Sequence, residues 1–174
     1  MVCIPEYEAR NTWDIRVYPG SDPSGHILAT ELDTDTMKAL ESGASVLYVP
    51  DHAALARFPT EGYSNWQWWE LMSSAGAFVL DRQPRELTPI VSAIDTWFRS
   101  HRLGLLVEAR VGDGKLMASS VDIVNDLDRR IVARQLRASI EEYMGSSAFN
   151  PSVLIDATGA RGLTSYRGLP PRIP

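Results

Sequence analysis

Residues 103–121, LGLLVEARVGDGKLMASSV, decide the fold of this chain. Every second position of the first half is apolar, with Glu108 and Arg110 on the opposite face, and this period of two predicts a strand. The apolar positions are Leu105, Val107, Ala109 and Val111. Gly112-Asp113-Gly114 tolerates the positive φ angles of a tight turn, so a returning strand is expected over residues 115–121. The stretch therefore predicts an antiparallel hairpin.

A closing helix is expected after the hairpin, with Ile131, Val132, Leu136, Ile140, Tyr143 and Met144 near one face. Asn125, Asp126 and Asp128 would place hydrogen-bond acceptors and negative charge at its start, and Gly145 would end it. The expected polar face holds Arg130, Arg134, Arg137 and Glu141.

The sequence before the hairpin alternates strand and helix signals. An apolar stretch at residues 26–32 leads to a short helix, capped by Asp33 or Thr34, and then to the apolar run at residues 45–49. A run of that kind is typical of a strand covered on both faces, as in a parallel sheet. We therefore expect an α/β fold with a mostly parallel sheet, in one domain over residues 1–150. Residues 151–174 are rich in Gly and Pro and are expected to form a tail or inter-domain segment.

Composition excludes several classes of function. The 17 Lys and Arg against 22 Asp and Glu give a net charge of -5, which disfavours nucleic acid as a partner. No run approaches the roughly 18 apolar residues that span a bilayer, so no membrane partner is expected. Cys3 is the only cysteine, and His26, His52 and His101 lie far apart, so neither a metal site nor a cofactor is predicted. At 174 residues the chain is shorter than a complete TIM barrel, which takes about 250.

No set of residues predicts catalysis by this chain. The carboxylates in suggestive settings are Glu61, Glu70, Glu108 and Asp122, and salt bridges or helix-surface positions account for such residues more simply than a glycosidase pair. Glu108, for example, is expected to pair with Arg110 or with an arginine of the last helix. The chain also lacks the Gly-x-Ser-x-Gly turn that presents a nucleophile. The chain by itself is therefore predicted not to be an enzyme.

Aromatic residues are concentrated in one segment. Trp66 and Trp69 would share a face of a helix, whereas Trp68 would point about 100° away from Trp69, so the three cannot enter one core together. One interpretation is that two are buried and the third fills an interface with a neighbouring domain. The other is that they form a stacking surface for sugar rings or for a partner.

Several stretches resemble the C-terminal region of large bacterial proteins of glycoside hydrolase family 2, the β-galactosidase- and β-glucuronidase-like enzymes. They are ARFPTEGYSNWQWWELM (56–72), PIVSAIDTWFRSHRLGLLVEARVGDGKLMASSVDI (89–123) and RRIVARQLRASIEEYM (129–144). NTWDIRVYP (11–19) and ILATELDTDTMKALESGASVLYVP (27–50) resemble the start of the same region, so the resemblance covers about residues 10–150 in order. This region of the family is often labelled sugar-binding.

The resemblance implies a non-catalytic accessory domain that serves domain packing, the rim of the active site or subunit assembly in carbohydrate degradation. In the family, the catalytic glutamates lie in a preceding barrel domain, so no catalytic residue carries over to this chain. The implied partners are that barrel domain, a second copy of the chain, or carbohydrate if the domain is a stand-alone binding module. The implied contact residues are Tyr63, Asn65, Trp66, Trp68, Trp69 and Trp97.

The resemblance also implies a class I glutamine amidotransferase-like, or flavodoxin-like, fold. Amidotransferases carry a nucleophilic cysteine after a central strand, whereas the strand ending at Val49 leads here to Pro50-Asp51-His52. Amidotransferase chemistry is therefore excluded, and the fold would serve as a scaffold. The compartment stays open: no N-terminal signal is visible, which leaves the cytoplasm, while relatives of this kind are often periplasmic or secreted.

Overall fold

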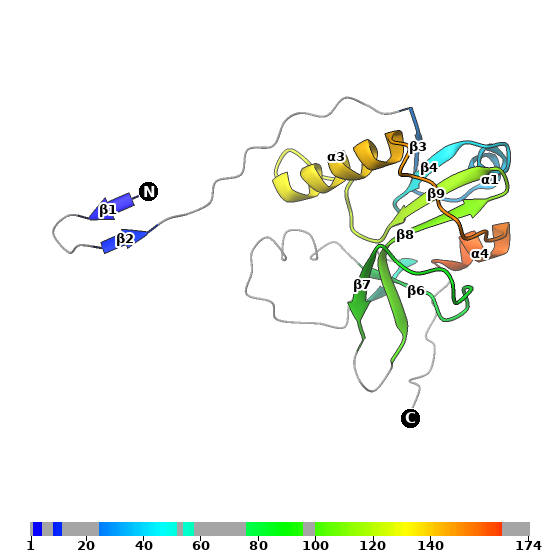
Figure 1. Ribbon diagram of the computed structural model, residues 1–174, viewed down its shortest axis with the longest axis horizontal. Helices are drawn as coiled ribbons and strands as arrows, with labels where there is room; N and C mark the ends of the chain where they lie inside the picture. The colour runs from blue at the N-terminus through cyan, green and yellow to red at the C-terminus, as the bar shows by residue number, and fades with distance from the viewer. Residues whose placement is uncertain are drawn as a thin grey trace.

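A computed structural model describes residues 2–4, 9–11, 25–51, 54–57, 76–95 and 100–164 (Figure 1). Strands β1 (Val2–Ile4) and β2 (Ala9–Asn11) pair with each other in antiparallel fashion. None of the helices in the described ranges is long and apolar enough to cross a membrane.

The remaining described strands form one mixed sheet in the order β3-β4-β9-β8-β6-β5, with β7 also paired to β8. Their bounds are β3 (Ile27–Ala29), β4 (Ser45–Tyr48), β5 (Ala56–Arg57), β6 (Gly76–Val79), β7 (Val91–Ile94), β8 (Arg102–Val111) and β9 (Gly114–Ser119). The α/β class is as expected, and β3, β4 and β9 run parallel. The described pairs involving β5, β6, β7 and β8 are antiparallel, so the expectation of a mostly parallel sheet holds only for β3, β4 and β9.

The hairpin that decided the fold is confirmed, with Val111 paired to Gly114 across the turn and Gly112 at φ 59°. One detail differs from the predicted alternation. Val107 packs in the core cluster on one face of the sheet, whereas Leu105 belongs to the cluster on the other face. The pairing of β7 with β8 shifts register at this point, which reverses the faces of the residues before Leu106.

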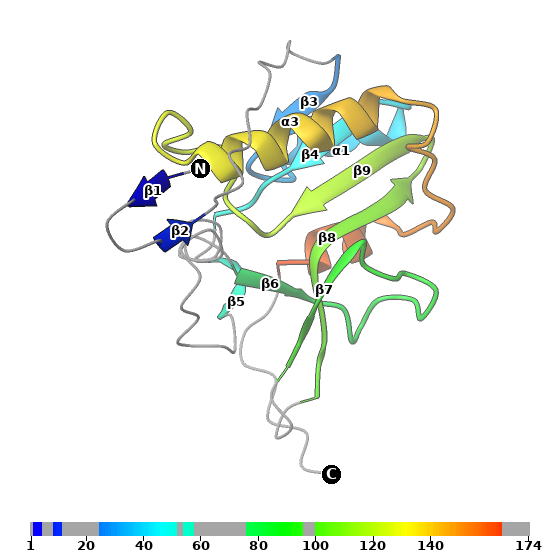
Figure 2. The same ribbon diagram turned by 60° about the vertical axis from the view of Figure 1, so that its left-hand side comes forward.

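Helices cover both faces of the sheet (Figure 2). Helix α1 (Thr34–Glu41) connects β3 to β4, and α4 (Ala157–Gly162) lies on the same face; α3 (Ile131–Gly145) lies on the other. The predicted cap of α1 is Asp33, whose carboxylate accepts a hydrogen bond from the Thr36 N–H at 2.8 Å. The sheet is thus the middle of three layers.

The start and the polar face of α3 differ from expectation. The helix begins at Ile131 without a side-chain cap, because the preceding residues form a turn in which the N–H groups of Arg129 and Arg130 both donate to Asp126 O. Asp126 has a positive φ of 52°, which a helical residue cannot have. Glu141, expected on the polar face, is buried.

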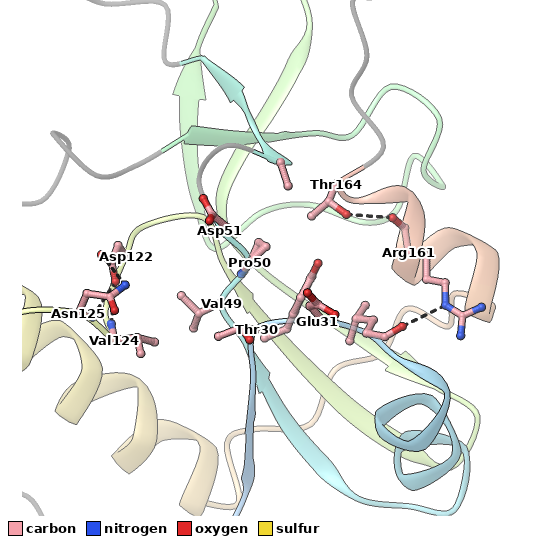
Figure 3. A pocket seen from close by; sticks show the side chains of 13 residues that line it. Thr30, Glu31, Val49, Pro50, Asp51, Asp122, Val124, Asn125, Arg161 and Thr164 are labelled. Atoms are coloured by element: carbon pink, nitrogen blue, oxygen red, sulfur yellow. Dashed lines mark hydrogen bonds between the residues drawn. The ribbon is translucent and has the colours of Figure 1, made fainter.

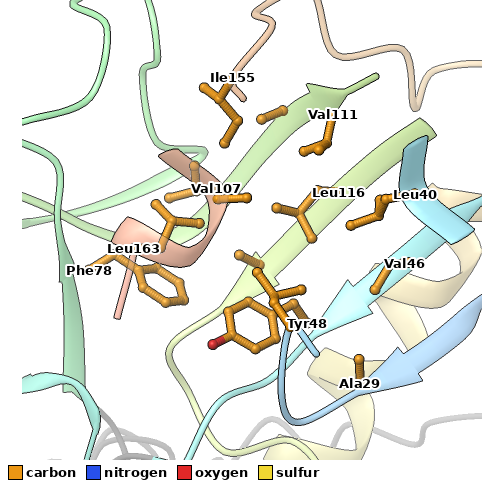
Figure 4. Packing of buried hydrophobic residues seen from close by; sticks show 14 of the residues in the cluster. Ala29, Leu40, Val46, Tyr48, Phe78, Val107, Val111, Leu116, Ile155 and Leu163 are labelled. Atoms are coloured by element: carbon orange, nitrogen blue, oxygen red, sulfur yellow. The ribbon is translucent and has the colours of Figure 1, made fainter. Parts of the chain in front are cut away.

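The main apolar cluster fills the space between the sheet and helices α1 and α4 (Figure 4). Residues 151–164, from the segment expected to be a tail or inter-domain piece, contribute buried Ile155, Ala160 and Leu163 to it. The segment also pairs with β8, since the Arg110 N–H donates to Val153 O and the Ile155 N–H to Arg110 O. Residues 165–174 lie outside the described residues.

Candidate functional site

A cleft of about 730 Å³ lies at the carboxyl ends of the three parallel strands β3, β4 and β9 (Figure 3). In α/β sheets, ligands bind outside the carboxyl ends of the strands. The segments that follow the strands supply most of the lining, and α4 closes one side. The lining residues are Thr30, Glu31, Leu32, Tyr48, Val49, Pro50, Asp51, Ala54, Asp122, Val124, Asn125, Arg161 and Thr164.

The floor of the cleft is the end of β4. The Val49 N–H donates to Ala29 O at 2.8 Å, which extends the parallel pairing of β3 and β4 to the cleft edge. Val49 and Pro50 are buried, whereas Asp51 is exposed.

Asp122, after β9, forms one wall and is fixed by its neighbours. Its carboxylate accepts hydrogen bonds from the N–H groups of Val124 (2.9 Å) and Asn125 (3.0 Å) and from the Asn125 side chain, and it lies 3.3 Å from Arg130. Burial alone would raise the pKa of Asp122, but these hydrogen bonds and the Arg130 charge outweigh it and lower the pKa below its usual value. Asp122 is therefore an ionised side chain of fixed orientation.

Helix α4 and the segment that follows β3 form the opposite wall of the cleft. Arg161 Nε donates to Leu32 O at 3.2 Å, and the Thr164 hydroxyl donates to Arg161 O at 3.3 Å. Burial raises the pKa of the Tyr48 phenol and the nearby Glu31 charge raises it further, while a hydrogen bond with Thr164 acts in the opposite direction. Tyr48 consequently offers a neutral hydroxyl at the cleft.

The described lining is suited to hydrogen bonding. It combines hydroxyls from Thr30, Tyr48 and Thr164 with an amide, a guanidinium and three carboxylates. Among the described lining residues there is no histidine, cysteine or serine. The described part of the chain also holds no group of three or more His, Cys, Asp or Glu side chains that could bind a metal ion. These groups could donate and accept hydrogen bonds with a polar small molecule.

The predicted contact residues Tyr63, Asn65, Trp66, Trp68, Trp69 and Trp97 lie outside the described residues, as do Glu61 and Glu70. Among the described residues on either side of this segment, Arg57 of β5 pairs with Gly76 of β6. Gly76 in turn exchanges two hydrogen bonds with Ser120, two residues before Asp122. Ala54, three residues before Arg57, lines the cleft.

Two polar pairs outside the cleft were not predicted. His101 Nδ1 lies 2.6 Å from Asp81 Oδ2, with both side chains at most 6% exposed. Glu108 accepts a hydrogen bond from the hydroxyl of Tyr143 on α3 at 2.8 Å, so its partner is a tyrosine and not the expected arginine. Neither pair lines the cleft. The isolated positions of His101 and Asp81 in the sequence gave no signal that they would meet.

The buried carboxylate of α3 forms a third cluster. Glu141 Oε1 accepts a hydrogen bond from Arg137 Nε at 2.9 Å and lies 3.7 Å from His26 Nε2. This cluster ties the start of β3 to α3, on the face opposite to α1. Its contacts are consistent with a structural ion pair.

The chain belongs to a family described as a domain of unknown function (DUF8487), whose model matches residues 45–165. The match begins at β4 and extends to Thr164 and beyond, so it includes α4 and most of the cleft lining. No curated protein matches the chain.

Proposed function

We propose that this chain is a non-catalytic accessory domain of a glycoside hydrolase family 2 protein, serving domain packing, the active-site rim or subunit assembly. The observation that carries the proposal is how the resembling stretches fall on the fold. Residues 89–123 include β7, β8 and β9 at the centre of the sheet, and residues 129–144 include nearly all of α3. The stretches that carry the resemblance thus form the core of one folded unit and occur in the same order along the chain, as expected of a domain that is shared between proteins.

The finer fold assignment belongs to the same proposal. A class I glutamine amidotransferase-like or flavodoxin-like scaffold accommodates helices on both faces and a parallel β3-β4-β9 group, with a cleft at the carboxyl ends of those strands. The antiparallel strands β6, β7 and β8 would then be additions at one side of the parallel group. A shared fold does not by itself establish a catalytic activity, and the domain would act as a scaffold.

The test is to express this chain together with the family 2 barrel protein encoded in the same or a neighbouring reading frame. Size-exclusion chromatography with light scattering should show a stable complex, or a single unit if the two are fused. The purified chain alone should release no nitrophenol from 4-nitrophenyl β-galactoside or β-glucuronide. Turnover by the chain that is lost in a Glu31→Gln variant would contradict the non-catalytic role.

A second candidate function, carbohydrate binding by the domain itself, is favoured by the cleft. Binding sites for small molecules pair apolar surface with a few converging polar groups, and this cleft supplies hydroxyl, amide and carboxylate groups that can bond to sugar hydroxyls. Calorimetric titration with methyl β-galactoside and methyl β-glucoside tests this function, and flat titrations with both would contradict it.

A further inference from the structure

We propose that two copies of this chain pair through strand β7, edge to edge and antiparallel, about a twofold axis at Ser92. The proposal specifies the subunit-assembly role proposed above and in that respect rests on it. It concerns a strand at the edge of the sheet whose apolar side chains are exposed and whose residues do not line the cleft.

Strand β7 lies along one side of β8, and in the described part of the chain it pairs with no other strand. The Ile90 N–H donates to Leu106 O at 2.8 Å, which extends this pairing by one residue. Figures 1 and 2 both show β7 beyond the part of the sheet that α1 and α3 cover. Within the described residues, the opposite edge of β7 therefore carries backbone groups to which another strand could bond.

The side chains at this edge are exposed although three of them are large and apolar. Ile94 is 90% exposed, Ile90 51% and Val91 40%. Ile90, Ser92 and Ile94 alternate along the strand and share one exposed face, whereas Ala93 packs against the apolar cluster on the α3 side. Edge strands usually carry charged residues or an internal Pro that block pairing, and residues 90–94 have neither. These features are typical of an edge strand that pairs with another chain.

The sequence of this edge fits a second copy of itself. An antiparallel register pairs positions that are equally far from a twofold axis. With the axis at Ser92, Ile90 of one copy lies opposite Ile94 of the other. In the same register Val91 lies opposite Ala93 of the other copy. Apolar side chains directly opposite each other stabilise a pair of strands, so both copies gain from the same contacts.

The flanking residues and the length of the strand set the limits of the contact. Asp95 would face Pro89 of the second copy, so no like charges meet in this register. Pro89 ends the pairing because it has no N–H. A contact over residues 90–94 of each copy is far smaller than that of a stable complex, which takes about 20–30 residues a side. We therefore expect a weak dimer that forms reversibly as the concentration rises.

Sedimentation velocity of the full 174-residue chain tests self-association between about 10 μM and 1 mM, a range that covers weak complexes. The sedimentation coefficient should rise with concentration. Ile94→Lys should remove this rise, because a lysine blocks the pairing of edge strands. The Ile94 side chain is too exposed to contribute to the core, so this variant should melt like the wild type. Ile131→Lys, at an exposed position of α3, is the matched control and should still associate.

Disulfide cross-linking tests the register. In a Cys3→Ser background, which leaves no other cysteine, Ser92→Cys places one thiol from each copy at the axis. Residues directly opposite each other in antiparallel strands have the Cα separation that a disulfide needs. Mild oxidation should convert this variant to a covalent dimer, whereas Ser139→Cys, at an exposed position of α3, should stay monomeric.

A chain that stays monomeric up to about 1 mM, or a dimer that persists in Ile94→Lys, would overturn the proposal without affecting the proposed complex with the barrel protein. Loss of that complex in Ile94→Lys, with no self-association of the wild type, would assign the edge to the barrel domain and overturn the second copy as its partner. A dimer that meets both tests without any complex with the barrel protein would support the pairing and contradict the accessory-domain role.

Discussion

At the scale of single residues, the tightest constraint in the fold is Gly114, the first residue of β9. A Cβ atom at this position would lie 2.2 Å from Leu40 O and 2.6 Å from Ala44 O, and both atoms belong to the backbone around the end of α1. The hairpin turn and the α1–β4 connection therefore approach each other as closely as a residue without a side chain allows. Sequence reasoning assigned this glycine to turn geometry alone.

The Gly114→Ala variant should lose about 3 kcal/mol of unfolding free energy, because backbone atoms cannot yield as a flexible side chain would. Gly145→Ala is the matched control, since a Cβ there meets nothing within 4 Å and Gly145 is the last residue of α3. That variant should be neutral or slightly stabilised. Equilibrium urea unfolding measures both, and equal stability of the two variants would show that the close approach is absent.

The lowered pKa of Asp122 predicts how the stability of the fold depends on pH. Its pKa is lowered in the folded chain, despite burial, by hydrogen bonds from Asn125 and Val124 and by Arg130. A lowered pKa stabilises the fold above the unfolded-state value of about 3.9, and that contribution is lost as the pH falls through the folded-state value. Asp122→Asn should therefore reduce stability at pH 7 and flatten its decline between about pH 5 and pH 2.

The measurement for Asp122 is the free energy of unfolding at a series of pH values from 7 to 2. Asp128→Asn, which replaces an exposed carboxyl in the same connection, is the control and should follow the wild-type profile. An Asp122→Asn profile parallel to the wild type across the whole range would contradict the role given to its hydrogen bonds.

At the scale of elements, Arg102 fastens the connection between β6 and β7. Its guanidinium donates to three backbone carbonyls, at 3.4 Å to Gln83, 3.3 Å to Pro84 and 2.8 Å to Leu87. The backbone N–H of the same residue donates to Asp81, which also holds His101. One strand residue thus orders a connection that has no helix or strand of its own.

Replacing Arg102 by Lys should loosen this connection locally, because an ammonium group cannot match the fork geometry of a guanidinium. We expect amide hydrogen exchange over residues 83–90 to quicken by about tenfold, with little change in β4 and β9. Arg110→Lys, an exposed position on the same strand, should leave the exchange pattern as it is. Uniform acceleration throughout the sheet would indicate a global loss of stability instead.

The elements that the sequence predicted well are those whose signals are local. The β8–β9 hairpin follows from period-two alternation and a turn, β4 from a continuous apolar run, and α1 from its Asp33 cap. The predicted start of α3 was wrong because the N–H groups of Arg129 and Arg130, which a side-chain cap could have bonded, donate to Asp126 O in a turn. The register shift near Leu106 depends on pairing with β7, which no local pattern encodes.

The cleft itself was not predicted. Its lining comes from the ends of three strands and from α4, so it exists only once residues as distant as Glu31, Asp122 and Arg161 are brought together by the fold. The sequence instead indicated the aromatic-rich segment as the candidate site, and that segment lies outside the described residues. A strand order read from the sequence could have placed Asp51 and Asp122 at one edge of the sheet.

At the scale of the whole molecule, the folded unit extends beyond the boundary expected at residue 150. Ile155, Ala160 and Leu163 are at most 4% exposed and complete the apolar cluster beneath α1 and α4. The buried Gln83 side chain donates to Gly159 O at 2.9 Å, which joins α4 to the connection that Arg102 orders. The matched family model also extends to residue 165. Two glycines of this stretch, Gly159 and Gly162, lie within α4.

Truncated chains test whether residues 151–164 belong to the folded unit. A chain ending at Asn150 would uncover the apolar cluster and lose three buried apolar side chains, each contributing about 1.5–3 kcal/mol when the residue is large, which approaches the total stability of a typical domain. We expect that chain to lose its cooperative thermal transition and to bind the dye ANS. A chain ending at Thr164 keeps α4 and should melt cooperatively near the temperature of the full chain. Equal melting of both truncated chains would mean that residues 151–164 contribute nothing to the core.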